Sequence, residues 1–177
     1  MTKTTRNLFL LVLALVTMQW AMPAQAQSKS VTYSNLAGVW QTDEQQMEYG
    51  TSAANVTFLA SGKGTMKYVG AFDLEGASYK FIVYVPLSYK ITGDNVISYK
   101  SGIAKSKLES SQRIPTQIRN YFAPYIKAIK EMITNKSSYL QVQRLTDDYL
   151  VMENMVYKRI GDAPADTPAS NGKSRRR

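Results

Sequence analysis

The residues from Tyr79 to Ile91 alternate in polarity, and this alternation constrains the fold more than any other feature of the chain. Apolar side chains occupy every second position, namely Tyr79, Phe81, Val83, Val85, Leu87, Tyr89 and Ile91. The positions between them include Lys80, Ser88 and Lys90. A period of two residues is typical of a strand with one buried face and one exposed face. The sequence therefore predicts a long strand here, bent near Pro86 because proline donates no backbone hydrogen bond.

Shorter apolar stretches with turn sequences between them predict further strands. They are Val39–Tyr49, Asn55–Ala60, Thr65–Phe72, Val96–Lys100, Ser138–Leu145 and Tyr149–Ile160. Most neighbours in this series read as hairpins, which are antiparallel. The series predicts an all-β fold of about eight antiparallel strands that run up and down and close into a barrel, because closure removes exposed strand edges.

One segment before the last hairpin has a different period. Apolar residues recur three or four positions apart at Ile114, Ile118, Phe122, Ile126, Ile129 and Ile133. This spacing predicts a helical insertion over about 106–135. Pro124 lies inside the stripe and removes a backbone donor, so we expect two short helices or one kinked helix.

The chain begins with a segment typical of an export signal. Lys3 and Arg6 precede the apolar run Leu8–Val16, and Ala24-Gln25-Ala26 supplies the small residues of a cleavage site. The sequence predicts a signal peptide over residues 1–26 and a mature protein in the periplasm or outside the cell. No later stretch reaches the length of a transmembrane segment.

The other end of the chain has the composition of a disordered tail. Residues 161–177 are small and proline-rich, lack an apolar period and end in three arginines. Such a segment buries too little apolar surface to order itself. The sequence therefore predicts one barrel domain over residues 27–160, followed by a disordered basic tail.

The chain contains no cysteine and no histidine. Their absence excludes disulfides, thiolate metal sites, cysteine nucleophiles and Ser-His-Asp triads. The carboxylate pairs Asp43-Glu44 and Asp147-Asp148 have no catalytic partner that the sequence identifies. We therefore expect no enzyme activity, no metal site and no cofactor.

Two short motifs resemble those of a known family. The phrase Leu36–Trp40 contains Gly-X-Trp, which is similar to the start of the first strand in exported bacterial lipocalin-like proteins of the calycin superfamily. The phrase Tyr157-Lys158-Arg159 is similar to the last strand of such domains. The resemblance implies that Gly38, Trp40 and Arg159 are structural residues, with Arg159 packed across the Trp40 indole at the closed end of the barrel. Typical lipocalins place their helix after the eighth strand, whereas the helical segment here precedes the last hairpin.

The resemblance also implies a ligand site. A barrel of about eight strands either holds one small ligand or is filled by its own side chains. We expect a small apolar or amphipathic ligand inside it, lined by Phe58, Met66, Tyr68, Tyr79, Phe81, Val83, Val85, Leu87, Val151, Glu153 and Met155. If Tyr149–Ile160 is one strand, Glu153 shares the inner face with Val151 and Met155. A buried carboxylate there needs a partner, for which Arg144 and Lys67 are candidates.

The net charge of +9 is concentrated around the helical segment. Between Lys100 and Lys136 only Glu109 and Glu131 oppose eight cations, namely Lys100, Lys105, Lys107, Arg113, Arg119, Lys127, Lys130 and Lys136. This cluster suits an anionic ligand or an anionic envelope partner. The alternative function is therefore an interaction protein with a filled core that contacts partners through its basic helical face. No nucleic-acid recognition motif accompanies the charge.

Overall fold

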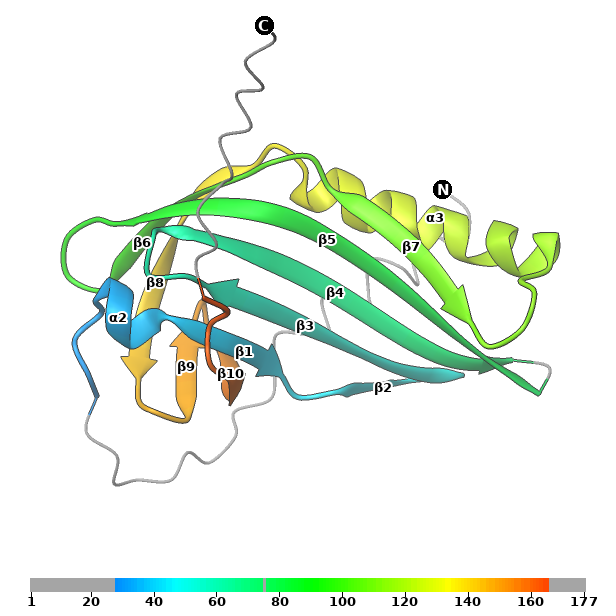
Figure 1. Cartoon of the computed structure of the whole chain (residues 1–177), viewed down its shortest axis with the longest axis horizontal. Coiled ribbons are helices and arrows are strands. Elements are labelled where there is room, and N and C mark those ends of the chain that lie inside the picture. Colours follow the sequence, from blue (N-terminus) through cyan, green and yellow to red (C-terminus); the bar gives the residue numbers. More distant parts are fainter. Residues whose placement is uncertain (1–27, 75, 166–177) are drawn as a thin grey trace, which may run out of the picture.

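The structure is a computed structural model that describes residues 28–74 and 76–165. The signal peptide predicted over 1–26 and most of the predicted tail lie outside the described residues. The described elements are α2 (Tyr33–Leu36), β1 (Gly38–Thr42), β2 (Gln45–Met47), β3 (Gly50–Phe58), β4 (Lys63–Leu74), β5 (Ala77–Ile91), β6 (Val96–Ser101), β7 (Lys105–Ser110), α3 (Thr116–Ile133), β8 (Ser137–Leu145), β9 (Tyr149–Met152) and β10 (Met155–Gly161). Figure 1 shows their arrangement.

The strands form one antiparallel sheet that closes on itself. Eight of them follow one another in the order β1-β10-β9-β8-β6-β5-β4-β3, and pairing between β3 and β1 completes the ring. Strand β2 extends the hairpin with β3, and β7 pairs with β5 beside the ring. The antiparallel all-β architecture is therefore confirmed, in the form of a ring of eight strands.

Strand β5 confirms the predicted alternation. Each of its inward side chains from Tyr79 to Tyr89 is no more than 6% exposed. The strand changes partner along its length, because it pairs with β7 as far as Tyr84 and with β6 from Leu87. Pro86 lies at this change, and its carbonyl accepts a hydrogen bond of 2.9 Å from the amide of Gly102 in the β6–β7 connection. A residue without an N–H fits where the ladder to one neighbour ends and the next begins.

Two predicted strands are each divided in the structure. The segment predicted as Val39–Tyr49 contains β1, β2 and a turn that leads into β3. The segment predicted as Tyr149–Ile160 is a hairpin of β9 and β10, turning at Glu153 and Asn154, whose φ angles are 49° and 63°. Two successive residues with positive φ make the two-residue turn that suits the twist of a hairpin.

The helical insertion is shorter than predicted and contains one helix. Residues 106–110, at the start of the predicted insertion, belong to β7 instead. Helix α3 begins at Thr116 and continues through Pro124 to Ile133. Of the two predicted alternatives, two short helices or one kinked helix, the structure contains a single helix. Proline removes one backbone hydrogen bond, and burial of the apolar stripe of α3 compensates for that loss.

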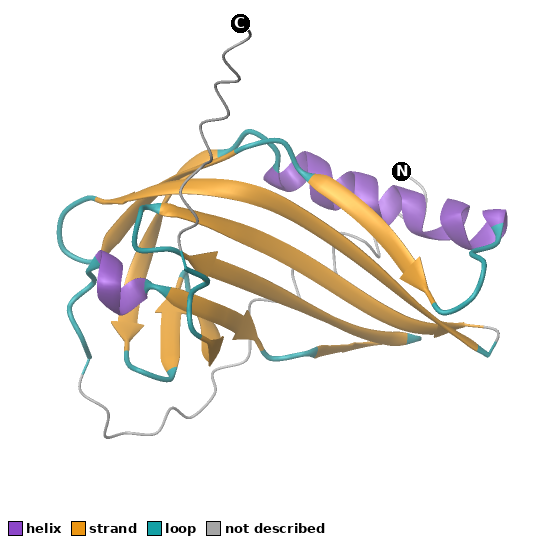
Figure 2. Ribbon diagram, in the orientation of Figure 1, coloured by secondary structure: helices purple, strands orange, loops and turns teal. Residues whose placement is uncertain are grey.

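Helix α3 packs on the half of the sheet that lies away from α2 (Figure 2). Its buried residues are Ile118, Phe122 and Ile133. The Phe122 ring lies 5.0 Å from the ring of Phe72 on β4 and 5.8 Å from that of Phe81 on β5. The apolar core therefore extends from the inside of the strand ring to the underside of α3.

Candidate functional site

Trp40 and Arg159 meet at the end of the ring beside α2. The Trp40 side chain is fully buried, and its indole Nε1 donates a hydrogen bond of 2.9 Å to the carbonyl of Leu36. The guanidinium carbon of Arg159 lies 4.3 Å from the centre of the indole ring. Strands β1 and β10 place the two residues opposite one another in the ladder. This is the contact that the resemblance of the two motifs implies.

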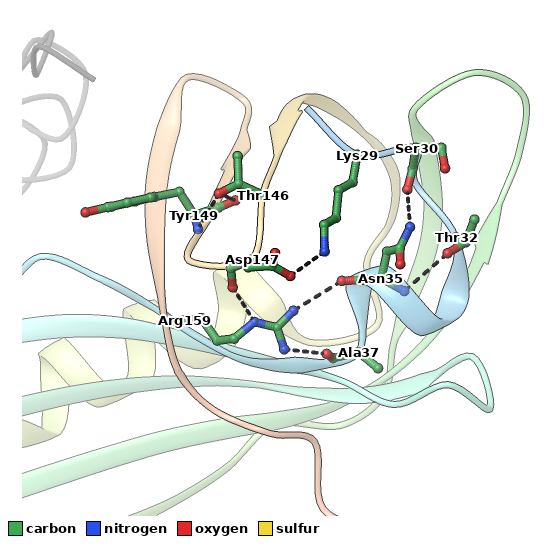
Figure 3. A network of polar contacts seen from close by, with 9 residues as sticks. All are labelled: Lys29, Ser30, Thr32, Asn35, Ala37, Thr146, Asp147, Tyr149 and Arg159. Carbon is green, nitrogen blue, oxygen red and sulfur yellow. Dashed lines mark hydrogen bonds and ion pairs between the residues drawn. The ribbon is translucent and has the colours of Figure 1, made fainter. Parts of the chain in front are cut away.

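Arg159 also binds three backbone carbonyls, which belong to two segments: α2 with its C-cap residue, and the turn between β8 and β9 (Figure 3). Its Nε donates to Asp147 at 2.7 Å, Nη1 to Ala37 at 2.8 Å and Nη2 to Asn35 at 3.2 Å. A planar guanidinium suits this arrangement because its donors have fixed directions. With its donors occupied by main-chain oxygens, Arg159 has a structural role here.

The segment before α2 is fastened to the same end of the molecule (Figure 3). Lys29 forms an ion pair with Asp147, and its hydrogen bond to that carboxylate lowers the pKa of Asp147. The amide of Lys29 donates to the Leu145 carbonyl at 2.7 Å. Thr32 caps α2 by accepting from the amide of Asn35 at 3.2 Å. These contacts close one end of the ring with main-chain and side-chain hydrogen bonds.

Gly38 is part of this closure because a larger residue would displace Arg159. A Cβ at Gly38 would lie 2.5 Å from Nη1 of Arg159 and 3.3 Å from the indole nitrogen of Trp40. We expect Gly38→Ala to lower the free energy of unfolding by about 1–3 kcal/mol, measured by urea denaturation. Gly161→Ala is the matched control, since a Cβ at Gly161 meets nothing within 4 Å. Equal stability of the two variants would contradict the steric explanation.

The residues predicted to line a ligand cavity lie mostly in a packed core. Six of them, each no more than 6% exposed, belong to the core cluster: Phe58, Tyr79, Phe81, Val83, Val85 and Leu87. Met66 and Tyr68 are partly buried and pack against them. These side chains belong to one cluster with residues from β1, β6, β8, β9 and α3. The interior of the ring is therefore the hydrophobic core of the protein.

The last hairpin places its residues differently from the prediction. Leu150 and Met152, rather than Val151, contribute to the core cluster of the ring. Glu153 is exposed in the β9–β10 turn, where its carboxylate accepts a hydrogen bond of 2.7 Å from the amide of Gln141. The predicted interior position of Glu153 is therefore wrong. The turn reverses the chain at this residue and ends the alternation on which the prediction depended.

Two partly buried tyrosines that sequence reasoning did not pair, Tyr68 and Tyr157, pack against the core. Burial raises the pKa of Tyr157 on β10 strongly, and the nearby Tyr68 adds to the effect. Burial also raises the pKa of Tyr68. The Tyr157 hydroxyl donates to the sulfur of Met155 at 3.8 Å, which places predicted lining residue Met155 beside it. Both tyrosines therefore stay neutral at physiological pH and supply polar atoms in an apolar setting.

A groove of about 750 Å³ lies between β7 and α3. Its apolar lining consists of Ile103, Ala104, Leu108, Ala123 and Ile126. Its cationic lining consists of Lys107, Arg119, Lys127 and Lys130, and Glu131 is the acidic residue at the same surface. The fold thus gathers four of the eight cations noted in the sequence around one apolar surface.

Hydrogen bonds at the carboxyl end of α3 fix that end of the groove. The amide of Ala104 donates to Oγ1 of Thr134 at 3.2 Å, and the amide of Asn135 donates to the Gly102 carbonyl at 2.9 Å. The hydroxyl of Ser101 donates to the last helical carbonyl, that of Ile133, at 2.6 Å. The helix is therefore anchored to the connection that leads into β7, and the groove is largely preformed there.

The cations of the groove differ in their partners. The Nζ atom of Lys107 lies 2.5 Å from a carboxylate oxygen of Glu109, and this contact raises the pKa of Lys107. The Nζ atom of Lys127 lies 3.9 Å from a carboxylate oxygen of Glu131. Arg119 and Lys130 have no carboxylate within ion-pair distance among the described residues. Among the described residues, no carboxylate therefore neutralises these two charges.

In the part of the chain that the structure describes, no three acidic side chains gather as a metal site would require, and no helix is both long and apolar enough to cross a membrane. Family models, curated proteins and solved structures show no significant match to this chain.

Proposed function

We propose that this chain is an exported, lipocalin-like binding protein without catalytic activity, whose ligand is a small amphipathic molecule with an anionic head group. The Gly-X-Trp phrase, the Arg159–Trp40 contact and the ring of eight strands support the lipocalin-like interpretation. The amino-terminal sequence supports export. The ligand site we propose is the groove between β7 and α3, outside the ring.

The groove itself carries this proposal. Small-molecule sites are concave, mostly apolar and equipped with a few polar groups that orient the ligand, with volumes of about 300–1,000 Å³. The β7–α3 groove, at about 750 Å³, combines apolar side chains from both elements with Arg119 and Lys130. An acyl chain fits against Leu108 and Ile126. Arg119 and Lys130 lie about 16 Å apart along α3, so a cation is available for an anionic head group toward either end of the groove.

The packing of the ring interior argues for this location. Val83 and Val85 are fully buried, and Phe58 is 1% exposed. A ligand inside the ring would have to displace such side chains from a packed core, which is costly. The groove requires no comparable rearrangement.

Isothermal titration calorimetry with decanoate and decanol tests the proposal. We expect the protein to bind decanoate at one site, about tenfold or more tighter than decanol, because a charge-assisted contact distinguishes the two. Arg119→Gln combined with Lys130→Gln should remove most of this preference. Lys90→Gln, which removes an exposed cation of β5 away from the groove, should leave it unchanged.

A second variant tests the location of the acyl chain. Ala123 is exposed and lines the groove, so Ala123→Trp should fill it and weaken both ligands without disturbing the core. Decanoate binding that survives in the Ala123→Trp variant would place the ligand elsewhere. Absence of binding to the unaltered protein would instead favour the alternative function, in which the cations of α3 contact an anionic envelope partner.

A further inference from the structure

Strand β7 has a free edge. Its six residues pair with β5 on one side, and no other strand pairs with it among the described residues. In an antiparallel strand with one neighbour, alternate residues direct their N–H and C=O groups away from the sheet. Such an edge is a template for another strand unless its side chains prevent pairing.

The side chains of β7 alternate between two faces. Leu108 is opposite Phe81 in the register with β5, so it shares the inward face and packs against the core. Lys107 and Glu109 lie on the outer face, where they form an ion pair. Hydrogen bonding between them raises the pKa of Lys107 and lowers that of Glu109, so both side chains are charged at neutral pH.

This pattern is complementary to itself. When two antiparallel copies of β7 meet with Leu108 opposite Leu108, each Lys107 is opposite the Glu109 of the second copy, and Ser106 is opposite Ser110. A shift by one residue places inward side chains opposite outward ones. A shift by two residues in one direction places Lys107 opposite Lys107, and in the other it places Glu109 opposite Glu109, which is unfavourable.

We propose that the protein forms a homodimer in which the β7 strands of two copies pair antiparallel about Leu108. Lys105 and Lys107 discourage the pairing of an unrelated basic strand at this edge, whereas a second copy places its Glu109 opposite Lys107. The proposed interface shares part of β7 with the ligand groove, because Ser106, Lys107 and Leu108 also line the groove. The dimer is therefore tested without ligand. A six-residue edge makes a small interface, so the dimer is expected to be concentration-dependent.

Sedimentation velocity of the purified protein over a range of concentrations, without added ligand, tests this proposal. The unaltered protein should sediment as a dimer at the upper concentrations. Glu109→Lys should weaken dimerisation about tenfold or more, because it places lysines opposite one another at two positions. Lys107→Glu should do the same with carboxylates. Lys90→Glu, at the far end of β5, is the control and should still dimerise.

Variants that restore opposite charges across the interface test whether the β7 strands themselves form the dimer contact. The double variant Lys107→Glu with Glu109→Lys exchanges the two charges and should dimerise again. A mixture of the two single variants should form a heterodimer, because each carboxylate then meets a lysine. Circular dichroism checks that each variant is folded. A monomer at all concentrations, dimers in both single variants, or failure of the double variant to restore the dimer would overturn the proposal.

Discussion

Replacement of Trp40 by alanine is expected to lower the free energy of unfolding by about 3–5 kcal/mol, the range for loss of a large core aromatic side chain. Trp40 is fully buried, and the Arg159 guanidinium covers its ring at 4.3 Å. Its removal leaves a cavity at the closed end and an unpaired carbonyl at Leu36. Urea denaturation followed by circular dichroism measures the loss.

A conservative variant separates packing from hydrogen bonding at this position. Trp40→Phe keeps an aromatic ring beneath Arg159 but removes the donor to Leu36, so we expect a smaller loss of about 1–3 kcal/mol. The difference in unfolding free energy between Trp40→Ala and Trp40→Phe then measures the packing of the aromatic ring, including its contact with the Arg159 guanidinium. A loss below about 1 kcal/mol for Trp40→Ala would show that this end of the ring does not depend on the Trp40–Arg159 contact.

Residues with strong local patterns were the ones that sequence could place. The alternation from Tyr79 to Tyr89 identified the buried face of β5 because lysine and serine separate the apolar residues. The contact of Trp40 with Arg159 was expected from two motifs far apart in the chain, and the ladder between β1 and β10 brings them together. The first prediction follows from residue types that favour one orientation of the strand, whereas the second is what the resemblance of the two motifs implies.

Residues with ambiguous patterns were placed wrongly. The sequence Tyr-Leu-Val-Met of β9 is apolar on both faces, so alternation does not fix its phase, and Leu150 and Met152 take the inward positions instead of Val151. Glu153 and Asn154 lack the glycine that marks most two-residue turns, which concealed the reversal there. Strand β7 was hidden because Leu108 is its one large apolar residue. The alternation of charged residues with small or apolar ones from Lys105 to Ser110 was the available signal.

The groove was beyond sequence reasoning for a geometric reason. Sequence identified the concentration of cations from Lys100 to Lys136, but these residues lie on β6, on β7, on α3 and in the loops between them. Which cations share a surface depends on how α3 crosses the sheet. The packing of Phe122 and the hydrogen bonds near Thr134 determine that crossing.

Phe122 is therefore the residue whose loss should affect both the fold and the proposed site. Its side chain is 1% exposed and contacts the aromatic rings of Phe72, Tyr79 and Phe81 at centre-to-centre distances of 5.0, 6.5 and 5.8 Å. We expect Phe122→Ala to lower the free energy of unfolding by about 3–5 kcal/mol in urea denaturation. Met132→Ala, on the same helix but 45% exposed, should change it by less than about 0.5 kcal/mol.

The same variant should also loosen α3 before the sheet unfolds. The carboxyl end of the helix stays fastened through Ser101 and Thr134, whereas Phe122 contributes most of the aromatic contacts between the helix and the sheet. Trypsin should then cleave the native variant first within α3, at Arg119, Lys127 or Lys130, and decanoate binding should be lost. Unchanged resistance of α3 to trypsin would mean that the anchored end alone holds the helix in place. The groove would then depend on the hydrogen bonds at Ser101 and Thr134 rather than on the aromatic cluster.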